Sequence, residues 1–145
     1  MKLSTKGRYG VRLMLDLAVY HGNGPVTLKD VSKRQDISEK YLGHLIPPLK
    51  NAGLITSVRG SRGGYTLAKP PGAINLLEIV SALEGPMCLV ECGEHPDMCR
   101  RSATCIAREV WAEASKRMFD YLASINLEKL VERQKGKQDK FNYSI

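Results

Sequence analysis

The chain has 145 residues, the size of one domain with small appendages, and carries 22 Lys and Arg against 15 Asp and Glu, a formal net charge of +7. A basic excess of this kind favours a nucleic acid or an anionic membrane surface as the partner. No apolar run is long enough to cross a bilayer, and the opening MKLSTKGRYG lacks the apolar segment of a signal peptide, so the composition argues against a membrane protein and predicts a cytoplasmic one.

The first third of the chain has the pattern of three helices. Apolar residues recur at helical spacing over residues 3–21, and a break that contains Gly and Pro follows at residues 22–25. Thr27 is a candidate N-cap for a short helix, and Ser38 is a candidate N-cap for a helix over residues 39–51. Two helices joined by a short turn, behind a first helix, predict a helix-turn-helix.

The second helix of this pair is the expected recognition helix. The residues on its exposed side are predicted to contact DNA; they are Ser38, Lys40, Tyr41 and His44. Arg8 is a further predicted DNA contact, because it lies on a face of the first helix away from the apolar residues. An ordinary helical hairpin with no DNA-binding role has the same pattern, so the helices alone leave both interpretations open.

The segment after the helices predicts a wing. Residues 54–58 and 65–67 are expected to be two strands of a hairpin, and the turn between them holds Arg59, Arg62 and three glycines. Such a tip can approach a phosphate backbone closely or place an Arg in a narrow minor groove. A flexible solvated turn is the alternative, but a hairpin directly after a helix-turn-helix is typical of a winged helix and favours DNA binding.

A linker at residues 69–72 leads to a helix capped by Asn75 and ended by Gly85-Pro86. A long helix is then expected from Thr104 or Cys105 to about Ser124. Its apolar residues have spacings of seven, four and three, typical of a coiled-coil seam, with Phe119 alongside; they are Trp111, Met118, Leu122 and Ile125.

Because so long a helix is hard to cover within a small chain, these residues are predicted to form a homodimer interface. Packing back on the first helix is the alternative. Asn126 is expected to cap a short last helix over residues 127–131, followed by a polar, disordered tail from residue 133.

Cysteines gather between the two halves of the chain. Cys92, Cys99 and Cys105 follow the spacing C-x6-C-x5-C, and Cys88 stands just upstream. In a reducing compartment clustered cysteines indicate metal or redox chemistry. Gaps of six and five suit a loop around something larger than one zinc ion, and iron–sulfur clusters tolerate varied spacing. An iron–sulfur cluster is therefore favoured, while redox-active thiols, zinc and inert cysteines remain open.

Two features near these cysteines favour the thiolate form and an anionic cluster. Cys105 is expected at the N-terminus of the long helix, in its positive field, and the loop carries Arg100, Arg101 and Arg108. Catalysis is not expected, because the three His lie in separate segments and neither a nucleophile motif nor a phosphate-binding glycine loop is present.

Several segments resemble the Rrf2 family of bacterial winged-helix transcription factors. They are residues 1–9, the turn Ile37-Ser38-x-x-Tyr41-Leu42, the wing over residues 58–65, and Cys92, Cys99, Cys105 and Trp111 in that order. The resemblance covers roughly residues 1–132, and the cysteines resemble those of its cluster-binding members, the iron–sulfur cluster regulator (IscR) type. It implies a homodimer that binds an operator and holds a cluster in each subunit. The three cysteines would ligate iron, and the DNA contacts would be Ser38, Lys40 and Tyr41 in the major groove and Arg59 in the minor groove.

The chain departs from that type at the fourth ligand. Arg108 stands where the type has a His three residues after the third Cys, and Arg8 and Arg12 stand at first-helix positions that some relatives use; none can ligate iron. Cys88 and His95 are the candidate fourth ligands, and an exogenous thiol or a carboxylate of Glu91, Glu94 or Asp97 could also fill this position. Both a [2Fe-2S] and a [4Fe-4S] cluster are compatible with this set, and the [2Fe-2S] form is favoured.

These features predict a mainly α fold with a small β-hairpin: a winged helix-turn-helix plus a long C-terminal dimerisation helix. The expected regions are 1–72 for DNA binding, 73–105 for the connecting helix and cysteine loop, 106–132 for the dimerisation helix and short last helix, and 133–145 for the tail. The expected function is a repressor whose affinity for a palindromic operator responds, through the cluster, to redox state, nitric oxide or iron–sulfur status. A cluster-free repressor that responds through thiols or a metabolite is one alternative, and a non-sensing architectural DNA-binding protein is a second. Activation in place of repression is also open.

Overall fold

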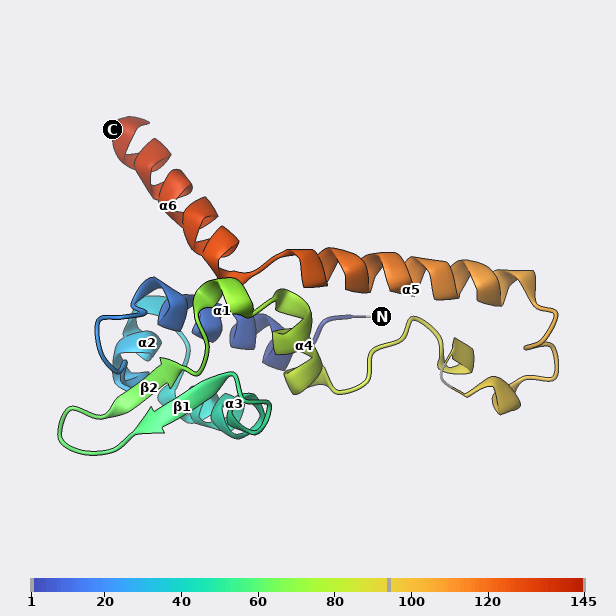
Figure 1. The fold of residues 1–145 in the computed structure, drawn as a ribbon, viewed down its shortest axis with the longest axis horizontal. Coiled ribbons are helices and arrows are strands. Elements are labelled where there is room, and N and C mark those ends of the chain that lie inside the picture. Colours follow the sequence, from blue (N-terminus) through green and yellow to red (C-terminus); the bar gives the residue numbers. More distant parts are fainter. Residues whose placement is uncertain (1, 94, 145) are drawn as a thin grey trace.

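The computed structural model describes residues 2–93 and 95–144 and has a globular body from which two helices extend (Figure 1). The body is built of helices and one hairpin, in the order α1 (Thr5–Val19), α2 (Leu28–Gln35), α3 (Glu39–Asn51), β1 (Ile55–Val58), β2 (Gly64–Leu67) and α4 (Leu76–Glu84). The long helices α5 (Ile106–Ser124) and α6 (Leu127–Ser144) follow, and three short 3-10 turns are η1 (Pro71–Ala73), η2 (Glu91–Gly93) and η3 (Pro96–Met98). No helix among the described residues is both long and apolar enough to span a membrane.

Side-chain caps fix where most of the helices begin. The predicted N-caps Thr27, Ser38 and Asn75 are confirmed, because each side chain accepts a hydrogen bond from the backbone N–H three residues on, at 3.2, 3.1 and 2.9 Å. Asn126 does the same for Lys129 at 2.9 Å. The first helix begins at Thr5 because Ser4, which the sequence analysis did not single out, is its N-cap.

The hairpin forms the predicted wing. Strand β1 pairs with β2 in antiparallel register from Ile55 opposite Leu67 to Val58 opposite Gly64. Val26, just before α2, exchanges two backbone hydrogen bonds with Tyr65, at 2.9 and 2.8 Å, and so anchors the wing to the helix-turn-helix. A Cβ at Gly64 would lie 2.5 Å from the carbonyl oxygen of Val26, so this contact requires glycine.

The core lies where α1, α3 and α4 meet the hairpin and the first turn of α6. Its fully buried side chains include Leu13, Leu42, Leu45, Leu49, Ile55, Ile79 and Leu127. Burial of these apolar groups is the main contribution to the stability of the body. The elements around it match the predicted winged helix-turn-helix.

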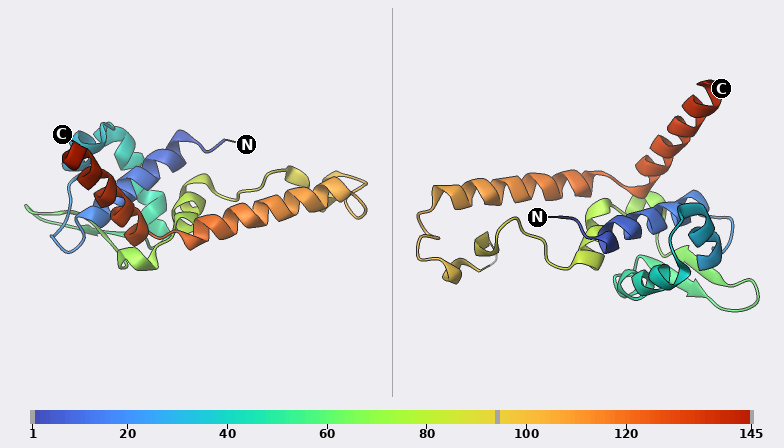
Figure 2. Two further views of the ribbon diagram at one scale, coloured as in Figure 1. Left: turned by 90° about the horizontal axis from the view of Figure 1, so that it is seen from above. Right: turned by 180° about the vertical axis from the view of Figure 1, so that it is seen from behind.

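Helix α5 and the cysteine loop form an arm that extends from this body (Figures 1 and 2). None of the described residues of α5 is buried. The loop lies along the distal part of α5, with its turns η2 and η3 far from the wing. Within one chain, the side chains of α5 are therefore exposed or only partly covered.

The predicted disordered tail is wrong, because α6 continues to Ser144 instead of ending near Val131. Its first turn is anchored by the buried Leu127 and by Leu130 and Val131, which pack against the core. Once a helix is nucleated by packing, each added residue costs little, and the Lys, Gln, Glu and Arg that follow are good helix formers. High polarity in this segment therefore reflects a solvated helix.

Candidate functional site

Of the four residues predicted to contact DNA from the recognition helix, Lys40 and His44 are exposed on α3, and no described hydrogen bond or ion pair involves their side chains. Ser38 is exposed as well, but its hydroxyl caps α3 by accepting the N–H of Tyr41. Tyr41 differs from the expectation: its side chain is half-buried, with its ring 5.5 Å from that of Tyr9 in a T-shaped contact at 82°. Tyr41 thus packs partly against α1, and only the rest of its side chain is exposed for the predicted DNA contact.

The wing tip presents both of its arginines. Arg59 and Arg62 are exposed. Gly60 has a φ of +112°, and a Cβ at Gly63 would lie 2.3 Å from the carbonyl oxygen of Val58, so the tight turn depends on glycine at these positions. The turn therefore brings two guanidinium groups to the edge of the body with little bulk around them.

Arg8 and Arg12 lie one turn apart on α1, and the structure gives them different roles. Arg8 is exposed, donates to the hydroxyl of Thr5 at 3.1 Å, and keeps its guanidinium near the surface. Arg12 donates through Nε to the side-chain oxygen of Gln35 at 3.2 Å and through Nη2 to the backbone oxygen of Gln35. Arg12 thus ties α1 to the turn that precedes α3, a role that the sequence analysis did not identify.

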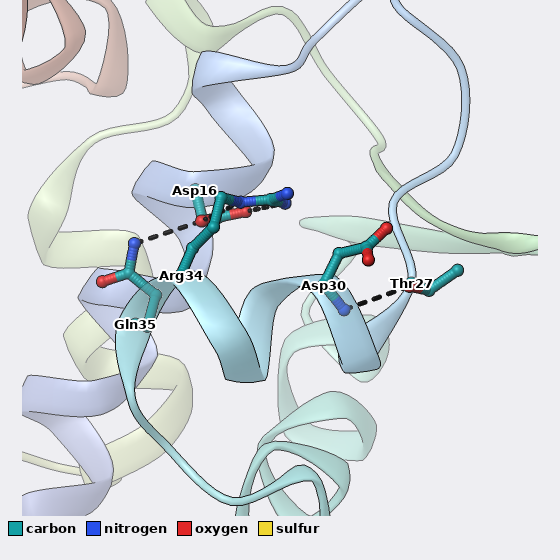
Figure 3. A network of polar contacts seen from close by, with 5 residues as sticks. All are labelled: Asp16, Thr27, Asp30, Arg34 and Gln35. Atoms are coloured by element: carbon teal, nitrogen blue, oxygen red, sulfur yellow. Dashed lines mark hydrogen bonds and ion pairs between the residues drawn. The ribbon is translucent and has the colours of Figure 1, made fainter.

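A buried carboxylate joins α1 to α2 (Figure 3). Asp16 is only 3% exposed and accepts two hydrogen bonds from Arg34, at 3.0 and 2.8 Å, and one from Gln35 at 3.1 Å. The hydrogen bonds to Asp16 raise the pKa of Arg34 above its ordinary value, and the guanidinium also lies 4.1 Å over the ring of Tyr20. This network fixes the orientation of α2 and hence of the helix-turn-helix.

In the cysteine loop the three predicted iron ligands occupy separate turns. Cys92 lies in η2, Cys99 follows η3, and Cys105 is the N-cap residue of α5. Arg108 in the first turn of α5 donates to the backbone oxygens of Cys92 and Ser102, both at 3.1 Å. Arg108 therefore organises the loop backbone, although its side chain cannot ligate iron.

The structure does not bring the predicted ligands together. Over residues 2–93 and 95–144, no group of three or more His, Cys, Asp or Glu side chains is placed to hold a metal ion. Cys88 lies at the base of the loop and lines a groove of about 370 Å³ with residues of the N-terminus, α4 and α5. His95 is exposed in the loop, and Glu94 lies outside the described residues.

The predicted dimer seam is split by the fold. Met118 and Leu122 line the same groove as Cys88, and Phe119 borders a second groove with Leu77 and Met87. Ile125 is only 4% exposed in the chain's own core, and its backbone oxygen accepts a hydrogen bond from Leu76 at 2.9 Å, so its assignment to an exposed seam is wrong. The apolar side chains of α5 that remain exposed are Ile106, Val110, Trp111 and Tyr121.

A helix-turn-helix with a wing that carries two arginines, on a chain with a net charge of +7, defines the class of winged-helix transcription regulators. The model of the Rrf2 family, described as "Iron-dependent Transcriptional regulator", matches residues 3–133. The chain belongs to the Rrf2 family.

Relatives in this family include regulators named CymR and regulators named IscR. The chain is 40% identical over 145 residues to the HTH-type transcriptional regulator CymR of Bacillus subtilis, and the match covers 100% of both chains. The structure of CymR, described as the global cysteine regulator of B. subtilis, is similar with a TM-score of 0.78 at 41% identity, covering 92% of this chain and 98% of that one. T. potens IscR is similar with a TM-score of 0.78 at 38% identity, covering 95% and 91%. These structures confirm the predicted winged-helix fold.

Proposed function

We propose that this chain acts in the cytoplasm as a homodimeric repressor, without enzymatic activity, whose affinity for a palindromic operator is set by an iron–sulfur cluster in each subunit. The observation that carries the proposal is the position of Cys92, Cys99 and Cys105. All three lie on the loop that joins α4 of the winged-helix body to α5. A change in this loop can therefore act on the body and on the dimer helix together.

The exposed polar and basic side chains of the body support DNA as the partner. Lys40 and His44 project from α3, and Arg59 and Arg62 lie at the wing tip. A recognition helix in the major groove reads base edges, while an Arg from a wing can enter a narrow minor groove and contact phosphates. These four side chains are the proposed DNA contacts, and Arg8, Ser38 and the exposed part of Tyr41 add contacts at the edges of the interface.

The apolar side chains of α5 support a homodimer. Ile106, Val110 and Tyr121 are 69%, 52% and 59% exposed and lie on one side of the helix, where the ion pair of Arg117 and Glu113 separates Val110 from Tyr121. Trp111, 44% exposed, lies about 100° further around the helix than Val110. An exposed surface with several large apolar side chains is typical of a protein interface. Two copies related by a twofold axis would cover it and would read two half-sites about 34 Å apart.

The donor chemistry fits an iron–sulfur cluster. Thiolates are the preferred ligands of such clusters, and the N-terminus of α5, where Cys105 is the N-cap residue, is a favourable place for an anionic cluster. In the proposal Cys92, Cys99 and Cys105 are ligands, Cys88 or His95 supplies the fourth, and a [2Fe-2S] form is favoured. The loop has to draw the three sulfurs together, and the absence of buried side chains among its described residues lets it rearrange. When bound, the cluster would link the three cysteines of the loop to one another, and this link would depend on iron supply and on oxidants.

The protein's part of the mechanism is a change in the order of this loop. Arg108 holds the loop backbone to the first turn of α5, so the loop and the dimer helix move together. A ligand shifts an equilibrium between two conformations only by its differential affinity for them. A typical coupling of this kind changes affinity by about 5- to 150-fold.

The first experiment is an anaerobic purification with a visible absorption spectrum and a count of iron and sulfide per chain. We expect a coloured protein with near-equal iron and sulfide, and we expect Cys92→Ser to lose both. Cys88→Ser is the matched variant: it loses the cluster only if Cys88 is the fourth ligand. A wild-type protein that stays colourless after reconstitution with iron and sulfide would refute the cluster.

A second candidate is a repressor that responds to thiol chemistry without a cluster. It is favoured by the separation of the three cysteines in the structure and by the similarity to a regulator described as the global cysteine regulator. In that case oxidation of the wild-type protein would change operator affinity, measured by competition against random DNA at fixed salt, and replacement of the cysteines would remove the effect.

A further inference from the structure

The end of α4 is held against the beginning of α1. Glu84 is the last residue of α4, and its Oε1 accepts hydrogen bonds from the backbone N–H of Ser4, at 2.9 Å, and from the Ser4 hydroxyl. Ser4 is itself the N-cap of α1 and accepts the N–H of Gly7 at 3.3 Å. A carboxylate at a helix N-terminus is favoured by the helix dipole. Glu84 therefore adds a second cap to α1, supplied by another helix.

Two glycines of α1 permit this close contact. A Cβ at Gly7 would lie 2.5 Å from Oε1 of Glu84, and a Cβ at Gly10 would lie 1.9 Å from Cδ1 of Leu83. Both glycines are buried and lie one turn apart on the helix. The last turn of α4 thus fits into a face of α1 that has no side chains, so a shift of one helix has to move the other.

Further along α1, other side chains hold the recognition helix. The ring of Tyr9 packs edge-on against that of Tyr41 in α3, at 5.5 Å. Arg12 binds the side chain and backbone oxygen of Gln35, the last residue of α2, just before the turn into α3. Since α1 is one helix of 15 residues, about 22 Å long, it connects the contact with Glu84 to the contacts with α3 as one body.

Glu84 also borders the cysteine loop directly. Gly85, with a φ of +76°, ends α4, and Pro86 follows, two residues before Cys88. The structure thus joins the loop to Glu84, Glu84 to the N-terminus of α1, and α1 to Tyr41 and the turn before α3.

We propose that Glu84 is a positioning residue that transmits the state of the cysteine loop to the recognition helix through α1. A change in the loop moves Glu84 relative to Ser4, α1 shifts or loosens at its first turn, and Tyr9 and Arg12 change the placement of α3. This inference rests on the proposed sensing function. Glu84 is neither one of the proposed DNA contacts nor one of the proposed cluster ligands, so a purely structural cap at this position would affect stability and leave the response unchanged.

The test compares operator affinity in two states of the full-length homodimer. One state is reconstituted anaerobically with iron and sulfide, and the other is stripped with a chelator; the DNA is a duplex selected from a random pool with the wild-type protein. We expect the two states of the wild type to differ by about 5- to 150-fold and the two states of Glu84→Gln to differ by less than about twofold, with the iron and sulfide content of the variant unchanged.

Two further variants make the comparison specific. Glu78→Gln is the matched control, because Glu78 lies on the same helix but pairs with Lys69 at 3.5 Å and not with α1; it should keep the wild-type ratio. Ser4→Ala removes the hydroxyl that donates to Glu84 at the N-terminus of α1. This variant should reduce the ratio of operator affinities between the two states, as Glu84→Gln does. It also provides the test if Glu84→Gln does not fold.

Amide hydrogen exchange gives a readout that does not depend on a cluster. Glu84→Gln should speed exchange in the first turn of α1 and at the start of α3, while Glu78→Gln should not. If Glu84→Gln and Ser4→Ala both retain the cluster and both show the wild-type ratio of operator affinities between the two states, the role of Glu84 is overturned and the sensing function still stands. A wild type with no difference between its states overturns the sensing function, and unchanged exchange in α3 would then overturn the relay as well.

Discussion

The winged-helix body and the arm formed by α5 and the cysteine loop are stabilised in different ways. The fully buried side chains come from α1–α4, the hairpin and its flanks, and the first residue of α6. In the arm, the described residues of the loop and of α5 include no buried side chain, and four large apolar residues of α5 are exposed. The body therefore has a core of its own, whereas the order of the arm has to depend on what binds it. This division suits the proposed function, in which a rigid body binds DNA and the arm responds to a signal.

Truncation of a body residue should have the largest effect. Leu45 is 0% exposed, so Leu45→Ala should lower the free energy of unfolding by about 2–5 kcal/mol, measured by denaturant titration. The matched change in the arm, Val110→Ala, removes methyl groups from a residue that is 52% exposed and should act only through dimerisation, as a loss that depends on protein concentration. Equal destabilisation by both variants at every concentration would remove the distinction between the two regions.

Two ion pairs with the same 2.8 Å separation allow the next comparison. Arg34→Ala leaves the carboxylate of Asp16, whose side chain is 2% exposed, with Gln35 as its remaining described partner, so the free energy of unfolding should fall by about 2–3 kcal/mol. In the arm, Lys116 pairs with Asp120 at the surface, and Lys116→Ala should cost less than about 1 kcal/mol. Thermal unfolding of both variants at one protein concentration measures the difference, and similar losses would contradict the structural role of Asp16.

Substitutions in the body should weaken DNA binding, whereas a substitution on the surface of the arm should not. Arg59→Ala and Arg62→Ala should each weaken operator affinity about tenfold and reduce the slope of log affinity against log salt by about 1, because each removes a cation at the wing tip. Lys116→Ala is the control, since Lys116 lies on α5, away from Ile106, Val110 and Tyr121, and pairs with Asp120 at 2.8 Å. Fluorescence anisotropy over a salt series measures all three variants, and an equal effect of Lys116→Ala would place α5 at the DNA.

The smallest effect is expected at the end of α6. A chain that ends at Arg133 keeps the packed first turn with Leu127 and loses only the exposed continuation of the helix. The free energy of unfolding should change by less than about 0.5 kcal/mol, while helix content measured by circular dichroism should fall. A large loss of stability would show that the distal half of α6 has a partner.

The sequence by itself determined the features that depend on near neighbours in the chain. A Ser, Thr or Asn that accepts the N–H three residues later begins a helix wherever it stands, so Thr27, Ser38 and Asn75 could be identified from local pattern alone. The glycine-rich turn between two apolar strands likewise specified the wing. These signals were sufficient for the fold and for the order of its parts.

Only the tertiary structure decided the features that depend on contacts distant in sequence. The burial of Ile125, the packing of Tyr41 against Tyr9, and the link from Glu84 to Ser4 each join residues from separate elements. No local pattern encodes them, because a polar or apolar side chain has the same helical spacing whether it meets solvent or another helix. The end of α6 has the same cause: packing of its first turn nucleates a polar segment whose composition alone predicts disorder.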